Sequence, residues 1–364
     1  MINKKSDIDV LQYHKLALAP FVAPVAADLF ETISQELQET EGAFWDFIQL
    51  HNLAPIWYDA LKKNAADLSV SPQVLGMLRS RALHSAANYL LQRQGLNIIK
   101  QAFAESNVPY AVFKGAHIRE QLYPQQAVRP SCDIDVLVSK TDKVRAIQLL
   151  AENGYTIKPK AKDISHEVTM ASKTVSIDLH WEILRPGRTR IDLTDELLNN
   201  TVDYSVYRGL NNEATLFVML VHPVFAKYTS SNLASLIRMV DLIKWLQIET
   251  IDFEKVYFLL ERGGVKTAAW ITCTWLTLLT GISLPDSFIH AVKPSRMKTL
   301  YLTSWLRKNH AMALSEYPFF IKAGFTLPAH DNVRDVCRAA ICLYKEKKHA
   351  DKNLRNLLQA LKAP

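Results

Sequence analysis

The chain has 364 residues, enough for two or three domains or for one core with large helical extensions. Hydrophobic residues make up 49% and charged residues 22%, which excludes a largely disordered chain and predicts a buried core. The net charge of +7 suits phosphate-bearing partners, but it does not by itself indicate a nucleic-acid-binding protein.

The cysteines and the N-terminus indicate a reducing compartment. Cys132, Cys273, Cys337 and Cys342 form no CxxC pair and have no histidine at zinc-ligand spacing, so neither a disulfide framework nor a structural zinc site is expected. The first seven residues contain no apolar stretch that could act as a secretion signal. We therefore expect a cytoplasmic protein.

One uncharged stretch, residues 267–285, approaches the length of a membrane span. Five threonines, a glycine, a serine and a closing proline dilute its apolar character. The pattern favours a buried core helix that ends near Gly281, and no membrane span is predicted.

Helical periodicity covers the N-terminal region, residues 1–105, and a helix is expected from Pro72 to about Glu105. Residues 106–190 change character and predict a small mixed sheet covered on one face by helices. From Asp195 the pattern is helical again, which makes residues 191–364 a C-terminal helical region. The fold class is therefore α+β. Strands are expected at 110–113, 134–138, 155–157, 166–170 and 174–180, and helices at 117–122 and 141–153.

Two acidic residues, Asp133 and Asp135, begin an apolar strand. Alternate side chains of a strand share one face, so the two carboxylates are expected to point the same way, about 7 Å apart. Such a pair repels unless a cation lies between them, and Mg²⁺ commonly binds one or two carboxylates plus substrate phosphates. If the strand containing Asp178 pairs alongside, three carboxylates could hold two metal ions.

A glycine turn precedes this acidic pair. Lys114, Gly115 and Ala116 follow one strand and precede a helix, where glycine lets the backbone approach a phosphate and the helix amides point towards it. Lys114 and Arg129 could add positive charge beside a triphosphate. Each part alone has a simpler interpretation: an Asp-x-Asp pair is usually solvated, and the Asp7-Ile8-Asp9 segment, with the same spacing, is interpreted as a helix start.

Taken together, these motifs resemble the nucleotidyltransferase superfamily of DNA polymerase β, and more closely its branch of uncharacterised nucleotidyltransferases. The resemblance covers residues 80–250 and predicts a nucleotidyltransferase core at 106–190, flanked by the two helical regions. It rests on Lys114-Gly115, Tyr123-Pro124, Arg129, Asp133-Ile134-Asp135, Asp178-Leu179-His180-Trp181 and the pair Arg238 and Asp241.

The resemblance implies transfer of a nucleoside monophosphate from an NTP to an acceptor hydroxyl, dependent on two Mg²⁺ ions or on Mn²⁺. Asp133 and Asp135 would bind both metals, and Asp178 would hold the catalytic one and help to deprotonate the acceptor. The superfamily has a serine where this chain has Ala116, and Ser131 or backbone amides are expected to replace its contact with the triphosphate.

Alternatives remain open at this point. The acceptor could be a small molecule such as an aminoglycoside-like or sugar hydroxyl, a peptide or protein, or an RNA end. A catalytically inactive nucleotide- or partner-binding protein on the same fold is the main alternative function, and an RNA-binding helical scaffold rests only on the basic charge.

The remaining polar candidates have structural interpretations beside the functional ones. His180 shares a strand face with Asp178 and could contact substrate or a neighbouring loop, and His117 flanks the same site. Arg238 and Asp241, three residues apart on a helix, could bind substrate or pair with each other. The basic C-terminal tail, residues 345–355, is interpreted as a solvated helix face.

Overall fold

The computed structural model describes residues 10–22, 43–63, 70–158, 166–227, 236–248, 250–307 and 317–361. The Asp7-Ile8-Asp9 segment lies outside this set. Within it, a seven-stranded mixed sheet has the order β3-β4-β5-β2-β1-β7-β6. The strands are β1 (Tyr110–Phe113), β2 (Ile134–Val138), β3 (Thr156–Lys158), β4 (Glu167–Ala171), β5 (Ser176–His180), β6 (Thr201–Tyr204) and β7 (Tyr207–Leu210).

The centre of the sheet brings the predicted acidic strands together. β1 is antiparallel to β2, and β2 is parallel to β5. Their register places Asp135 directly opposite Asp178. Since paired residues of neighbouring strands point to the same side of a sheet, the two carboxylates share one face, as the sequence predicts.

The sheet extends beyond the range 106–190. β7 pairs parallel with β1, and β6 pairs with β7, so the expectation that the chain is wholly helical past Asp195 is wrong. Gly209 of β7 pairs with Val112, and a Cβ at this glycine would lie 2.6 Å from His117 Nδ1. These strands, TVDY and YRGL, contain polar residues and a glycine and lack the apolar run that marks β1.

Helices lie on both faces of the sheet, which corrects the prediction of a single covered face. Ile134, Val136 and Val138 of β2 belong to a buried cluster with side chains of α5 (Pro72–Glu105) and α7 (Lys143–Glu152). Leu137 of β2 points the other way, into a second cluster that includes Ile118 of α6 (Lys114–Leu122). Every residue of β1 and β2 is buried, as expected for strands covered on both sides.

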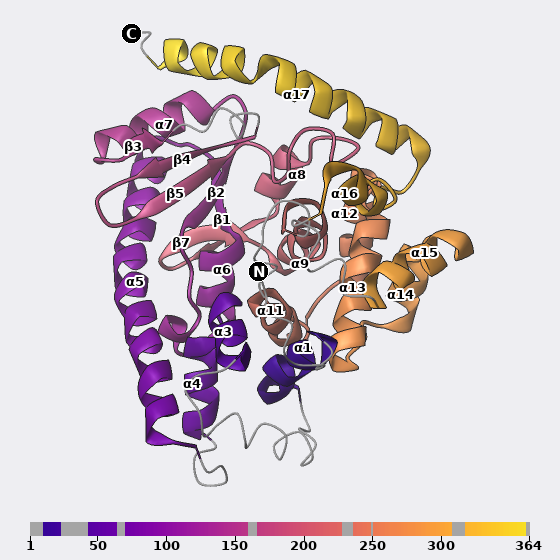
Figure 1. Ribbon diagram of the computed structural model, residues 1–364. Coiled ribbons are helices and arrows are strands. Elements are labelled where there is room, and N and C mark those ends of the chain that lie inside the picture. The colour runs from indigo at the N-terminus through magenta and orange to yellow at the C-terminus, as the bar shows by residue number, and fades with distance from the viewer. Residues whose placement is uncertain are drawn as a thin grey trace.

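The longest helix, α5, links the sheet to the N-terminal helices. It begins after Ser71, whose hydroxyl accepts a hydrogen bond from the Val74 amide, and it ends at Glu105, as predicted. Figure 1 shows α5 running along the sheet and continuing beyond it. There it packs against α4 (Ala54–Lys63), close to α3 (Ala43–Leu50) and α1 (Val10–Leu18).

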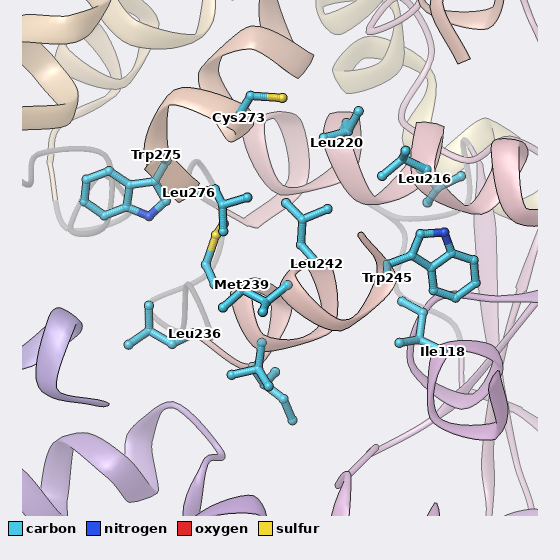
Figure 2. Close-up of a cluster of buried hydrophobic side chains, with 14 of the residues drawn as sticks. Ile118, Leu216, Leu220, Leu236, Met239, Leu242, Trp245, Cys273, Trp275 and Leu276 are labelled. Carbon is cyan, nitrogen blue, oxygen red and sulfur yellow. The ribbon is translucent and has the colours of Figure 1, made fainter. Parts of the chain in front are cut away.

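The second cluster continues from Ile118 between the helices that follow β5 (Figure 2). Leu220 of α9, Leu242 of α11 and Leu276 of α13 are fully or almost fully buried there. α13 ends at Gly281, whose φ is +75°, so the prediction of a core helix ending at this glycine is confirmed. The helices after β5 are α8 (Thr194–Asn199), α9 (Asn212–His222), α11 (Ile237–Trp245), α12 (Phe253–Gly263), α13 (Lys266–Thr280), α14 (Asp286–Val292), α15 (Arg296–Arg307) and α16 (Phe319–Thr326).

The last helix, α17 (Val333–Ala360), crosses over the molecule (Figure 1). Leu357 of this helix is buried in the cluster that contains Val136 of β2. Near the start of the helix, Asp335 forms an ion pair with Arg190, with 2.9 Å between Asp335 Oδ2 and Arg190 Nη2. Short helical turns complete the described chain: η1 (Ala19–Phe21), η2 (Gln126–Val128) and η3 (Pro223–Lys227). No helix among the described residues has both the length and the apolar character needed to cross a bilayer.

His117 of α6 has a structural place in this fold. It is fully buried, with Nδ1 3.0 Å from the Tyr207 hydroxyl oxygen and Nε2 3.0 Å from Thr215 Oγ1. Burial lowers the pKa of His117 from 6.5 to about 3. The histidine is therefore neutral in the folded protein at physiological pH.

This burial predicts acid sensitivity. Below pH 6.5 the unfolded chain binds a proton at His117 that the folded protein does not, so folding stability falls as the pH falls. Between pH 6.5 and 5 the loss is about 2 kcal/mol. The free energy of unfolding is measured with denaturant at pH 7 and at pH 5. His117→Gln should make the difference between these two values smaller by about this amount, whereas the substitution of the exposed His290, His290→Gln, should not. An unchanged difference in His117→Gln would contradict the assignment.

Candidate functional site

A cavity of about 240 Å³ lies where β1 and β2 meet the helices α9 and α11. It gathers most of the residues that the sequence predicts for substrate and metal, from segments separated by more than 100 positions. The predicted residues that line it are Lys114, Gly115, Arg129, Ser131, Asp133, Asp135, Arg238 and Asp241.

Asp135 is the centre of a charged chain of side chains. Lys114 Nζ lies 2.8 Å from Asp135 Oδ1, and His180 Nε2 lies 2.9 Å from the same oxygen. On its other side, His180 Nδ1 lies 3.1 Å from Glu167 Oε2. Asp135, His180 and Glu167 belong to three adjacent strands, and the register pairs Glu167 with His180. His180 is thus held between two carboxylates.

These contacts determine the charge of Asp135. Burial by itself would raise the pKa of this carboxyl, but Lys114 and His180 together hold it well below its usual range. Asp135 is therefore an anion at neutral pH. An anion in this place binds a cation without first losing a proton.

The turn between β1 and α6 has an unusual backbone. Lys114 has φ +56°, in the left-handed region that few residues other than glycine adopt. Such a conformation costs about 1–3 kcal/mol and persists only where surrounding contacts enforce it. Here the ion pair of Lys114 with Asp135 supplies such a contact. The strained residue directs its ammonium group to the acidic strand.

Gly115 allows the loop before β2 to approach this turn closely. A Cβ at Gly115 would lie 2.7 Å from Ser131 Oγ and 3.0 Å from Arg129 Nη1. A side chain here would therefore displace either the hydroxyl or the guanidinium. Ser131 in turn donates a hydrogen bond to the Asp133 carbonyl oxygen, 3.0 Å away. The serine hydroxyl thus stands between the glycine turn and the acidic pair.

Three of the predicted site residues, Ala116, Asp178 and His180, do not line this cavity. Ala116 is fully buried in the cluster that includes Val112 and Val136, so its side chain faces the core. Asp178 is half-buried and lies opposite Asp135 on the shared face of the sheet. Ser131, and not residue 116, therefore supplies the hydroxyl beside Gly115.

Three residues of the family-like motifs form one buried network. Arg129 Nη2 lies 2.6 Å from Asp241 Oδ2, and Arg129 Nε lies 3.3 Å from Asp241 Oδ1. Tyr123 donates its hydroxyl proton to Asp241 Oδ1 at 2.8 Å. The predicted pairing of Asp241 with Arg238 is therefore not the one formed. Arg238 instead lies beside His222, with Arg238 Nη1 and His222 Nδ1 3.2 Å apart.

The loop that precedes β2 is held from the other side by α5. Gln92 donates a hydrogen bond to the Ser131 carbonyl oxygen at 3.0 Å, and Ser85 donates to the Ala127 carbonyl oxygen at 2.6 Å. Gln92 also accepts a hydrogen bond from buried Arg119 at 2.6 Å. Helix and network together fix the position of the segment leading to the acidic pair.

Several residues at the site were not found from the sequence. Glu167 was assigned only to a strand, although its position on the face of His180 follows once the strands are paired. Thr215, Met219 and His222 come from α9, and Asn52 comes from the turn between α3 and α4. No local pattern distinguishes these from ordinary core or loop residues, because only the tertiary fold brings them to the cavity.

Carboxylates, the ligand type that a hard divalent cation prefers, lie at and beside the cavity. Asp135 and Asp178 share one face of the sheet, Asp133 lines the cavity just before β2, and the ammonium of Lys114 already stands at Asp135 as a cation. In the part of the chain that the structure describes, no three acidic, histidine or cysteine side chains are arranged to hold a metal ion. A metal at Asp135 would therefore have to displace Lys114 from the carboxylate.

The match to known families covers the whole of this site. The family model described as "uncharacterised nucleotidyltransferase" matches residues 38–281. This range contains every residue that lines the cavity. No curated protein sequence matches the chain.

Proposed function

Because the chain belongs to the uncharacterised nucleotidyltransferase family, we propose that it transfers a nucleoside monophosphate from an NTP to an acceptor hydroxyl. The observation that carries this proposal is the cavity in which Asp133 and Asp135 lie beside Lys114, Gly115 and Ser131. Carboxylates, a cation and a glycine turn meet there, and phosphoryl-transfer chemistry needs these three elements.

The reaction forms one bond and breaks one bond. The acceptor oxygen attacks the α-phosphorus of the NTP, and the bond from that phosphorus to the oxygen bridging to the β-phosphate breaks. Pyrophosphate leaves with the bonding electron pair, and the hydroxyl proton passes to a base. Asp178, half-buried on the same face as Asp135, is the proposed base.

Asp133, Asp135 and Asp178 would hold Mg²⁺ or Mn²⁺, with Asp133 and Asp135 shared between two ions. The metals would neutralise the charge of the triphosphate and of the leaving pyrophosphate. His180 holds Asp135 in place through its contact at 2.9 Å, and Glu167 supports His180 from behind. His180 is therefore a positioning residue in this proposal.

The nucleotide would lie against the glycine turn. Gly115 lines the cavity in the first turn of α6, where backbone amides can face a phosphate, and the Ser131 hydroxyl packs against this glycine. Lys114 and Arg238 line the cavity and would supply positive charge. Because Arg129 is buried in its pair with Asp241, we assign it the role of shaping this wall of the cavity.

The first test is pyrophosphate release from each of the four NTPs by the full-length protein, with Mg²⁺, with Mn²⁺ and with EDTA. Cell extract serves as the acceptor pool, and α-labelled NTP marks the product. We expect release that requires metal and a labelled product that identifies the acceptor class. Metal-dependent NTP binding by calorimetry without any release would support the inactive nucleotide-binding alternative instead.

A further inference from the structure

A second cavity, of about 290 Å³, adjoins the first. Asn52, Pro130, Ser131 and Cys132 line both. Cys132 directly precedes Asp133 in the sequence, so the wall between the two cavities ends at the acidic pair. A molecule in the second cavity therefore lies next to the site where the proposed function places the NTP.

The other wall of this second cavity is one face of α5. Arg81, His84, Ser85 and Asn88 line it, and their spacing of three, four and seven residues places them on the same side of the helix. Arg81 donates a hydrogen bond from Nη2 to Gln49 Oε1 at 2.6 Å, which orients its guanidinium from α3. Asn88 Nδ2 lies 3.1 Å from His84 Nε2.

The chemistry of this wall favours an anionic ligand. Of the described residues that line the second cavity, none is an aspartate or a glutamate, whereas Arg81 is a permanent cation. A guanidinium binds phosphate or carboxylate through two parallel hydrogen bonds. Asn88, Ser85 and Gln49 add groups that can pair with hydroxyls.

We propose that the second cavity is the acceptor site, and that it takes a small polyhydroxyl compound carrying a phosphate or carboxylate group. This inference rests on the proposed function, since an acceptor is needed only if nucleotide is transferred. The cavity has the size of a small-molecule site. An aminoglycoside-like polycation is disfavoured, because nothing on this wall would neutralise its charge.

The test measures binding of three six-carbon probes to the full-length protein by calorimetry: glucose 6-phosphate, glucose and glucosamine. Arg81→Ala removes the proposed anion contact. Arg79→Ala is the matched control, since Arg79 is an exposed arginine of the same helix that does not line the cavity. We expect glucose 6-phosphate to bind best, and Arg81→Ala to weaken it roughly tenfold or more. Arg79→Ala should leave it unchanged.

A chemical probe shows, independently of affinity, whether the ligand binds beside Cys132, which lines both cavities; lack of competition with ATP then assigns it to the second. Cys132 and Cys337 are both exposed, but Cys337 lies on α17 and lines neither cavity. Saturating glucose 6-phosphate should slow the alkylation of Cys132 by iodoacetamide, read by mass spectrometry, and leave Cys337 unaffected. ATP affinity should be the same in wild type, Arg81→Ala and Arg79→Ala.

Specific outcomes would overturn the acceptor assignment. These are equal affinity of glucose 6-phosphate for wild type and Arg81→Ala, tighter binding of glucosamine, or competition between glucose 6-phosphate and ATP. Binding of a short single-stranded RNA that needs Arg79 and Arg81 equally, without binding of the sugar phosphate, would also overturn it. If the sugar phosphate binds through Arg81 but no NTP is turned over, the proposed function fails while this anion site stands.

Discussion

Replacing Asp241 with asparagine is expected to lower the free energy of unfolding by about 3–5 kcal/mol, because it leaves the guanidinium of Arg129 buried without its counter-charge. Arg129 is 7% exposed and Asp241 is 1% exposed, so little of the guanidinium can be solvated in place of the lost carboxylate. Tyr123 loses a charged acceptor at the same time. Denaturant unfolding monitored by circular dichroism measures the change.

Two further variants test the cause of this loss. Asp203→Asn breaks a carboxylate–lysine pair with Lys100 at the exposed edge of the sheet and should change stability by at most about 1 kcal/mol. The double variant Arg129→Met/Asp241→Leu removes both charges and should recover most of the stability lost in Asp241→Asn. If the double variant is as unstable as Asp241→Asn, the unpaired charge is not the cause.

The network of Arg129 and Asp241 also shows where prediction from the sequence stops. The residues are 112 positions apart, and local spacing favoured a pair between Asp241 and its helical neighbour Arg238. Helical spacing shows only which side chains of one helix can meet. The pair that forms depends on the tertiary fold, which buries Arg129 beside Asp241 of α11. Tyr123, Arg129 and Asp241 are all part of the motifs that resemble the family. The structure explains why they occur together, because Tyr123 and Arg129 both bind the buried carboxylate of Asp241.

The strands at the centre of the sheet are predictable because each is built from β-prone apolar residues. β1, β2 and β5 occur where the apolar runs predict them, and the pairing that was required for Asp178 to approach Asp135 is the pairing observed. β6 (TVDY) and β7 (YRGL) have no such apolar run, since polar residues and a glycine interrupt them, and helix α9 follows β7 directly. The contact between Lys114 and Asp135 was missed for another reason: it depends on a left-handed backbone at a lysine, which no propensity favours.

Replacing Asp135 with asparagine is expected to reduce pyrophosphate release by about a thousandfold or more, the largest effect on activity that we predict. Asparagine keeps the shape and one oxygen of the side chain, so its contact with His180 can persist. It loses the negative charge that the proposed metal ions need and that Lys114 now neutralises. The measurement is the NTP assay with Mg²⁺, accompanied by thermal unfolding to show that the variant is folded.

Asp203→Asn again provides the matched control, since it removes one carboxylate from a lysine pair on the same sheet but far along the strand order from β2. It should keep the activity of the wild type.

Binding of Mn²⁺ to the protein without nucleotide distinguishes weaker metal binding from slower reaction of bound substrate. Asp135→Asn should weaken Mn²⁺ binding. Lys114→Met, which removes the competing ammonium from Asp135, should strengthen Mn²⁺ binding even though it removes a charge proposed to contact the triphosphate. Full activity in a folded Asp135→Asn variant would exclude the carboxylate from the reaction, and the cavity at β2 would then be a binding site without the proposed chemistry.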